Sequence, residues 1–378
     1  MVDPSLFTAP YNAALSSGLR AAGMNPLWAT RALRPSEGDA FSPADEVQRF
    51  FYTLTDGPHR RTGGVAKLIK AVEHVLGMQQ VAMLAARRNV AAVHFQWAVL
   101  PRIDAAFIAV MRRTRPVVLT VHDTEPFNGK RVSIAQRSGF RSVLAVADRL
   151  IVHTQAGRAA LARMGIPDAQ VATVPHGLLG DAGPLEEARR RADARWTVVQ
   201  FGKIQDYKGV DLLVEALGRL PQPVRQQLRV IVAGEPLILV EPLRARAEAL
   251  GLGDTLEWQL GYLDDDAVER VLAEADTFVF PYRAIEASGV FLLVAARQKW
   301  VVASDLGAFR DLIGTDGGAG EMVAPGDVDA LARALERSIG RRPTRRVADA
   351  VPSWEAIGAA TAQVYRDAAA SWRGRKAG

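Results

Sequence analysis

The stretch that decides the fold runs from residue 196 to residue 220 and reads "WTVVQFGKIQDYKGVDLLVEALGRL". It opens with the β-branched and aromatic residues of a buried strand, passes through a polar segment with two glycines, and ends as an amphipathic helix. A second strand-like run, "LRVIVAGE" (228–235), follows soon afterwards. Alternation of this kind predicts α/β units with a doubly wound parallel sheet.

The same alternation fills the rest of the chain, in two series that a charged segment separates. The further strand-like runs are 25–30, 90–99, 116–123, 149–154 and 170–177 in the first series, and 255–263, 276–282, 300–305 and 320–327 in the second. We therefore expect a first Rossmann-like domain (1–177), a linker (178–195), a second Rossmann-like domain (196–352) and a C-terminal helix (353–378) that returns to the first domain. Two such domains should face a central cleft, with the ligand site at the strand ends.

The beginning of the first series is irregular. A helical pattern over residues 11–23 follows Met1 almost directly, although a domain of this class should open with a buried strand. Either a first strand has been lost with a misplaced start, or residues 1–8 form an unusual sheet edge. Residues 31–60 are polar and are expected to be irregular.

Composition excludes several classes of protein. The 378 residues contain no cysteine, which rules out disulfides, thiolate metal sites and a cysteine nucleophile, and fits the reducing cytoplasm. Residues 1–180 carry 21 basic against 12 acidic side chains, and residues 181–378 carry 26 against 29. Either the genome uses arginine freely, or the basic first half rests on an anionic membrane surface or a pyrophosphate-bearing lipid. Nucleic acid is disfavoured, because the basic residues are scattered and lack interleaved aromatics.

Four motifs between residues 85 and 340 resemble, in order and spacing, those of GT-B glycosyltransferases of family four, bacterial exopolysaccharide type. The motifs are "VPHG" (174–177), "FGKIQDYKGVDLLVEAL" (201–217), "EASGVFLLVAA" (286–296) and "WVVASDLGAFRDLI" (300–313). The second resembles the Gly-Arg-x5-Lys-Gly segment, with Lys203 and Lys208 in the basic places, and the third resembles the Glu-x7-Glu segment. The resemblance implies transfer of a sugar from a nucleotide-diphosphate donor, with no other cofactor.

The donor diphosphate needs positive charge around it as it leaves. No Asp-x-Asp pair ends a strand here, because "LDDDAVE" (263–269) has the pattern of a helix start, so we expect no metal. Lys203 and Lys208 are placed to neutralise the diphosphate, and the backbone amides of Ser288, Gly289 and Val290 are expected to bind phosphate at a helix N-terminus.

Glu286 precedes that helix, and the family resemblance implies that it holds the donor sugar; the alternative is a carboxylate that caps the helix. The second Glu of the motif is replaced by Val294, which cannot accept a ribose hydrogen bond. This replacement leaves the donor and the retaining outcome open. Backbone contacts to the nucleotide are expected around Gly261, Tyr262 and Leu263.

Histidines end several strands of the first series. His122 and Asp123 follow a strand and are expected to face the reacting centre, where an inverting mechanism would use one of them as a base. His94 and His176 are expected on the acceptor side, although a strand-end histidine is often structural. No histidine spacing indicates a metal site.

The sequence thus predicts a metal-independent and retaining glycosyltransferase of hexosyltransferase type. Its acceptor would be a glycan hydroxyl, on a polyprenyl-pyrophosphate-linked oligosaccharide of exopolysaccharide assembly. The enzyme would be cytoplasmic and peripheral at the inner face of the plasma membrane. Two alternatives remain: a sugar-nucleotide epimerase, and a catalytically inert subunit that supports a partner.

Overall fold

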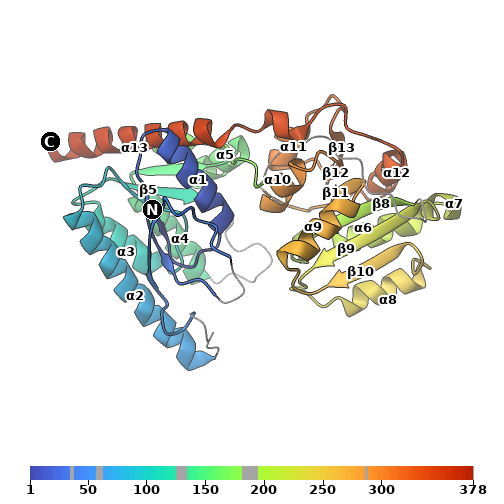
Figure 1. Ribbon diagram of the computed structural model, residues 1–378, viewed down its shortest axis with the longest axis horizontal. Coiled ribbons are helices and arrows are strands. Elements are labelled where there is room, and N and C mark those ends of the chain that lie inside the picture. Colours follow the sequence, from blue (N-terminus) through green and yellow to red (C-terminus); the bar gives the residue numbers. More distant parts are fainter. Residues whose placement is uncertain (35–37, 57–62, 125–133, 181–194, 286–287, 378) are drawn as a thin grey trace. The chain divides into compact units, whose positions relative to one another are not determined.

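The computed structural model describes residues 1–34, 38–56, 63–124, 134–180, 195–285 and 288–377. The chain divides into two compact units: unit 1 is Met1–Gly177 with Pro352–Gly378, and unit 2 is Leu178–Val351 (Figure 1). The predicted linker (178–195) lies for the most part outside the described residues.

Unit 1 is built on a parallel sheet with the strand order β3-β2-β1-β4-β5-β6-β7. The strands are β1 (Val2–Asp3), β2 (Leu27–Arg31), β3 (Glu46–Phe51), β4 (Val93–Phe95), β5 (Val117–Val121), β6 (Arg149–Val152) and β7 (Val171–Thr173). The order reverses between β1 and β4, which makes the sheet doubly wound, as predicted.

The start of the chain corrects one expectation. β1 has only two residues, but it pairs with both β2 and β4 at the centre of the sheet, so residues 1–8 do not form a sheet edge and the first strand is present. Two residues are too few to show a hydrophobic period. The segment 31–60, expected to be irregular, contains the edge strand β3. Its half-exposed polar residues Gln48 and Arg49 interrupt the hydrophobic pattern that would have predicted a strand.

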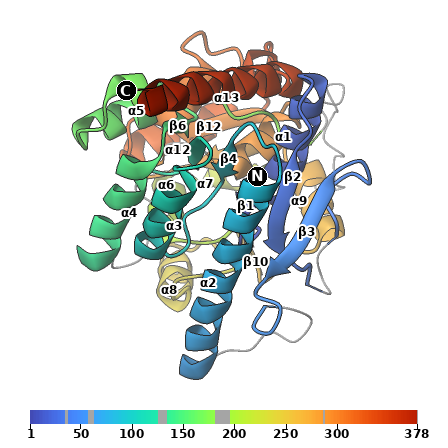
Figure 2. The ribbon, with the colours of Figure 1, turned by 90° about the vertical axis from the view of Figure 1, so that its left-hand side faces the viewer.

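The helices of unit 1 are α1 (Ala9–Ala21), α2 (Gly64–Arg87), α3 (Pro101–Met111), α4 (Ile134–Val146), α5 (Gln155–Arg163) and α13 (Trp354–Ala377). The C-terminal helix α13 starts with Ser353 as its N-cap and lies beside α1 (Figure 2). The two backbones touch: a Cβ added to Gly18 would lie 1.9 Å from the Trp354 carbonyl oxygen, and one on Gly358 would lie 2.0 Å from Gly18. Only glycine permits this approach, so both helices depend on it.

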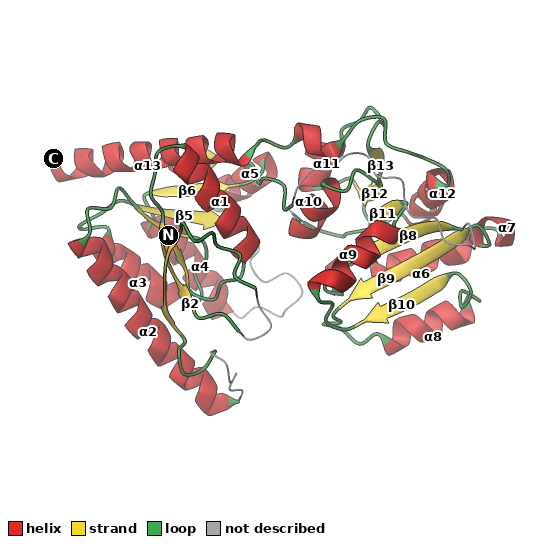
Figure 3. Ribbon diagram, viewed as in Figure 1, coloured by secondary structure: helices red, strands yellow, loops and turns green. Residues whose placement is uncertain are grey.

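Unit 2 contains a second parallel sheet, in the order β10-β9-β8-β11-β12-β13, again reversing at its first strand (Figure 3). Its strands are β8 (Trp196–Phe201), β9 (Leu228–Gly234), β10 (Leu256–Leu260), β11 (Thr277–Phe280), β12 (Trp300–Ser304) and β13 (Gly320–Val323). Its helices are α6 (Val210–Arg219), α7 (Gln222–Arg225), α8 (Glu241–Ala249), α9 (Asp265–Glu274), α10 (Gly289–Ala295), α11 (Gly307–Ile313) and α12 (Val328–Ser338).

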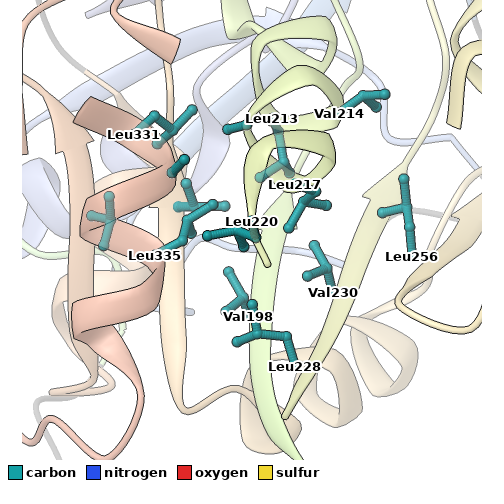
Figure 4. Packing of buried hydrophobic residues seen from close by; sticks show 14 of the residues in the cluster. Val198, Leu213, Val214, Leu217, Leu220, Leu228, Val230, Leu256, Leu331 and Leu335 are labelled. Atoms are coloured by element: carbon teal, nitrogen blue, oxygen red, sulfur yellow. The ribbon is translucent and has the colours of Figure 1, made fainter. Parts of the chain in front are cut away.

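The core of unit 2 holds the strand that opens the decisive stretch. Leu213 and Leu217 of α6 and Leu335 of α12 are fully buried against Val198 of β8 and Leu228 of β9 (Figure 4). Burial of a leucine side chain stabilises a fold by about 1.5–3 kcal/mol, so this cluster fixes α6 against the sheet. The position of α6 in turn fixes the loop between β8 and α6.

Candidate functional site

Lys208 lies in the loop after β8, at the carboxyl edge of the unit 2 sheet. Its side chain is only 5% exposed, and its ammonium lies 5.6 Å from the centroid of the Tyr282 ring. A Cβ added to Gly202, at the end of β8, would lie 2.8 Å from the Lys208 Nζ. The ammonium therefore rests on the backbone at the strand end, where parallel α/β sheets bind their ligands.

The surroundings of Lys208 disfavour its positive charge. Burial, together with the nearby charge of Lys203, lowers the pKa of Lys208 to about 8. Lys203 itself is exposed. No ion pair within the described ranges joins either lysine to a carboxylate. Two cations that lie close together without an acidic partner are the arrangement expected for an anion site.

The loop that carries Lys208 is fixed from below. Gly209 has φ +65°, and a Cβ there would lie 2.0 Å from the Pro281 carbonyl oxygen, so only glycine fits between the loop and the end of β11. The backbone N–H of Arg283 donates to the Tyr207 carbonyl at 2.7 Å, and its guanidinium pairs with Asp211. The loops after β8 and β11 are thereby joined.

The predicted phosphate-binding turn borders the same place. Ser288 is the N-cap of α10, and its Oγ accepts a hydrogen bond from the Phe291 N–H at 3.2 Å. A Cβ on Gly202 would also lie 3.0 Å from Val290 Cγ2, so the structure brings Lys208 and the start of α10 to one glycine. Glu286 lies outside the described residues. The N-cap that was the alternative role for Glu286 is occupied by Ser288.

Val294, which the motif resemblance predicts to stand in place of the second Glu, is fully buried in the core of unit 2 with Phe280, Phe291 and Phe309. Its side chain serves packing and is not exposed to a ligand. The helix predicted in this stretch is present as α10, and Val294 is part of the hydrophobic core.

The three residues expected to contact the nucleotide lie at the end of β10. The Gly261 N–H donates to the Gly234 carbonyl at 3.1 Å, and a Cβ on Gly234 would lie 2.4 Å from the Gly202 carbonyl oxygen. The ends of β10, β9 and β8 thus adjoin. Tyr262 is 73% exposed and Leu263 packs on the core, so Tyr262 is the one of the pair that can stack on a base.

In unit 1, the structure gathers three histidines at the carboxyl edge of the sheet. His122 follows β5, His153 follows β6 and His176 follows β7. The Tyr11 ring lies among them, with centroid distances of 5.0 Å to His122, 5.5 Å to His153 and 4.8 Å to His176. Trp97 stacks on His122 at 4.9 Å with an interplanar angle of 16°. We call these five residues the histidine cluster.

Both ring nitrogens of His122 have hydrogen-bond partners. Its Nε2 lies 3.1 Å from Gln96 Oε1 and its Nδ1 lies 3.1 Å from His153 Nε2. The other nitrogen of His153 lies 2.9 Å from the Val174 carbonyl oxygen. Asp123 follows His122 and is half-buried. His122 is therefore held in a hydrogen-bonded chain and does not have a free nitrogen for a base.

Burial keeps the three imidazoles of the histidine cluster uncharged. It lowers the pKa of His122 well below the ordinary value, that of His153 to about 4 and that of His176 to about 3. Neighbouring histidines lower the pKa values of His122 and His176 further. At neutral pH the histidine cluster is therefore a set of dipoles without net charge.

His94 lies apart from the histidine cluster. It is 1% exposed, and its two nitrogens lie 2.7 Å from the Tyr365 hydroxyl of α13 and 2.7 Å from Thr120 Oγ1. Burial lowers its pKa to about 3. The structure thus gives His94 a structural role between the sheet and α13, and an acceptor contact through its side chain would require these bonds to break.

Sequence reasoning did not select His153, Tyr11, Gln96 or Trp97 as site residues. His153 had a signal, since it ends a strand as His122 does, but the other three depend on the strand order. Within the described part of the chain, no group of three or more histidine, aspartate or glutamate residues could hold a metal ion. Metal independence remains a prediction.

Comparison with protein families gives matches to both units. Residues 9–178 match the model described as Glycosyltransferase Family 4, and residues 185–349 match the model described as Glycosyl transferases group 1. The MMP alpha-(1->4)-mannosyltransferase of Mycolicibacterium hassiacum is 31% identical over 173 residues, which are 43% of this chain and 41% of that protein. The chain therefore aligns with less than half of this relative's length.

Solved structures share the fold. Sucrose-phosphate synthase from Thermosynechococcus elongatus has a TM-score of 0.72 at 21% identity, covering 96% of this chain and 93% of that one. Anabaena HepE in complex with UDP has a TM-score of 0.62 at 18% identity, covering 100% and 97% of the two chains.

None of the helices in the described part of the chain is both long and apolar enough to cross a membrane.

Proposed function

We propose that this chain, which is a GT-B glycosyltransferase by its fold and by the family matches of both units, moves a sugar from a nucleotide-diphosphate sugar to a hydroxyl of a glycan acceptor. The observation that carries the proposal is the pair of cations, Lys203 and Lys208, beside the start of α10 without a carboxylate partner among the described residues. A diphosphate leaving group needs this kind of neutralisation.

In this proposal, the two lysines take the place of a metal ion at the diphosphate. The amides of Ser288, Gly289 and Val290 add hydrogen bonds to phosphate, and Glu286 holds the sugar hydroxyls. Gly261 and Leu263 offer backbone contacts to the nucleotide, and Tyr262 offers a ring to its base. HepE, which has the same fold, was crystallised with UDP, so nucleoside diphosphates are the first ligands to test.

A retaining reaction fits the histidine cluster better than an inverting one. An inverting enzyme needs a strong base, yet burial depresses the pKa of His122 and both its nitrogens are engaged. A retaining enzyme can let the departing phosphate oxygen take the proton of the acceptor hydroxyl. His122 would then orient a sugar hydroxyl, and Asp123 is left as the candidate base of the inverting alternative.

The acceptor is proposed to be a lipid-linked oligosaccharide at the inner face of the plasma membrane. Supporting this, one face of α2 exposes Val65, Leu68, Val72 and Leu76, which are 51–75% exposed. The basic residues of the helix include the exposed Lys67, whereas its one acid, Glu73, is buried. An apolar stripe with exposed basic charge suits an anionic lipid surface.

Vesicle sedimentation tests the membrane contact. The chain should bind vesicles with anionic phosphatidylglycerol more strongly than pure phosphatidylcholine, and Leu68→Ser with Val72→Ser should reduce this binding at least fivefold. The matched control is Leu237→Ser with Leu239→Ser, because these leucines of unit 2 are 49% and 79% exposed without an apolar stripe on a helix. Equal loss in both pairs, or no preference for anionic vesicles, would contradict the membrane proposal alone.

Calorimetric titration with UDP, GDP, dTDP and ADP, with and without magnesium, tests the donor site. One nucleotide should bind without magnesium, and Lys208→Ala should weaken that binding by about 1.5–3 kcal/mol. Sugar transfer by the isolated chain would then exclude the inert subunit, the rival that Val294 favours, and product analysis would exclude an epimerase. Failure of all four nucleotides would overturn the proposal in favour of the inert subunit.

A further inference from the structure

A chain of hydrogen bonds crosses the carboxyl edge of the unit 1 sheet from one strand end to the next. It runs from Gln96 after β4, through His122 after β5 and His153 after β6, to the carbonyl of Val174 after β7, with separations of 3.1, 3.1 and 2.9 Å. Gln96 is fully buried and His153 is 8% exposed. Because water has little access to these groups, each must find its donor or acceptor within the chain.

The Val174 carbonyl fixes the direction of the hydrogen bonds. A carbonyl oxygen only accepts, so His153 Nδ1 carries a proton. A neutral His153 then has a bare Nε2, which must accept from His122, and His122 Nδ1 therefore carries a proton. The Nε2 of His122 is left as a bare acceptor.

The amide of Gln96 supplies the matching donor. As placed, its Oε1 faces the bare Nε2 of His122, while its Nε2 has no hydrogen-bond partner among the described residues. The oxygen and nitrogen of a side-chain amide are distinguished only by their hydrogen bonds. A half-turn of the amide lets Gln96 Nε2 donate to His122 Nε2. This turn gives the amide donor a partner and removes the contact between two acceptors.

We propose that His153 and Gln96 are positioning residues that hold His122 as the Nδ1–H tautomer, with its Nε2 presented as a hydrogen-bond acceptor. The stacked ring of Trp97 fixes the plane of the imidazole. A sugar hydroxyl that replaces the Gln96 donor would meet this acceptor already oriented. This inference rests on the proposed function for its catalytic meaning, because that function places His122 at the sugar.

The alternative is an extra proton on the pair. His153 would then donate from both nitrogens, His122 would accept at Nδ1, and His122 Nε2–H would donate to Gln96 Oε1 as placed. Burial opposes this state, since it lowers the pKa of both rings. The two states differ at both nitrogens of His122 and at the Nε2 of His153. The clearest observable is the Nε2 of His122, which is bare in the first state and protonated in the second.

Long-range ¹H–¹⁵N correlation spectra of the chain, labelled with ¹⁵N-histidine, read the tautomer directly. His122 is assigned by the signal lost in His122→Ala. At pH 7.5 we expect its Nδ1 protonated and its Nε2 bare. In His153→Leu, which removes the acceptor, we expect the proton to move to Nε2 and to donate to Gln96 Oε1. His153→Gln keeps one acceptor and one donor and should retain the tautomer of the wild type.

The kinetic arm uses the same pair of variants. His153→Leu should lower kcat about tenfold with a small change in donor KM, and His153→Gln should restore most of kcat, because misplaced groups act mainly on the chemical step. A protonated Nε2 in the wild type, or a tautomer unchanged in His153→Leu, overturns the positioning proposal. If the tautomers behave as expected but no sugar is transferred, the proposed function fails while the positioning holds.

Discussion

At the carboxyl ends of its strands, unit 2 presents two cations, Lys203 and Lys208, whereas unit 1 presents three neutral imidazoles around Tyr11. The two sheets share a strand order that reverses at the first strand of each unit, and both edges are built from strand–loop junctions. Topology therefore fixes where a site lies, and the loop residues decide its charge. In the proposed function, unit 2 meets an anion and unit 1 orients neutral hydroxyls.

The largest expected effect is a loss of folding stability in acid, which the buried histidines cause. The folded pKa values of His94 (about 3) and His153 (about 4) lie below the unfolded value near 6.5, so the unfolded chain binds more protons between these limits. The free energy of unfolding therefore has its full value above pH 6.5 and falls as the pH drops. By pH 5, His94 and His153 should each have lowered it by about 2 kcal/mol. Chemical denaturation at pH 7.5 and 5 measures this, and His153→Gln should lessen the loss. An equal loss in wild type and variant would refute the contribution of His153.

Replacement of the buried cation should act next most strongly. Lys208→Ala should weaken nucleotide binding by about 1.5–3 kcal/mol, which is the range for a lost charged hydrogen bond. Lys203→Ala should weaken it less, because Lys203 is exposed and its interactions are screened by water. Lys67→Ala, an exposed cation of unit 1, is the matched control and should change nothing in calorimetry. An equal loss in all three variants would make the effect one of net charge alone.

Alkaline pH should weaken nucleotide binding at the anion site of unit 2, because Lys208 loses its charge. The pKa of Lys208 is about 8, so its charge is present at pH 7 and is lost as the pH rises through 8. Nucleotide affinity should fall about tenfold between pH 7 and pH 9, since about one in ten molecules keeps the charge at pH 9. Lys208→Arg should bind with little dependence on pH over this interval. A flat profile in the wild type would show that Lys208 carries no part of the binding.

The smallest effect is expected at the exposed ring. Tyr262→Ala should weaken nucleotide binding by about 0.5–1.5 kcal/mol, the gain typical of aromatic stacking, while Tyr262→Phe should bind as the wild type does. The same titrations with ribose 5-phosphate, which has no base, should not distinguish the variants. A loss of affinity for ribose 5-phosphate as well would place Tyr262 at the phosphate instead of the base.

The two edges also differ in how far sequence alone could predict them. The site of unit 2 is local: a strand, a glycine turn and a helix bring Lys203, Lys208 and the end of β8 together within a dozen residues. The histidine cluster depends on the order β1-β4-β5-β6-β7, which brings Tyr11 beside His122 and His153. A single sequence shows which residues end strands, but it does not show which strands are neighbours.

The same limit explains two features that the local pattern could not predict. β1 was missed because Val2 and Asp3 are too few to form a period, and its place at the sheet centre is set by neighbours on both sides. His94 has the signature of a strand-end site residue, yet α13 covers it with Tyr365 from the far end of the sequence. Long-range packing decided both, and neither leaves a mark in the local pattern.

The packing of α13 against α1 has a consequence for how the protein folds during synthesis. Gly18 and Gly358 form one helix contact, so the packing of unit 1 is incomplete until residue 358 has been synthesised. Unit 2, which is continuous in sequence from Leu178 to Val351, can finish folding on the ribosome first. The nascent first unit must wait with the α1 face uncovered, which makes this interval the one in which the chain most needs protection from aggregation.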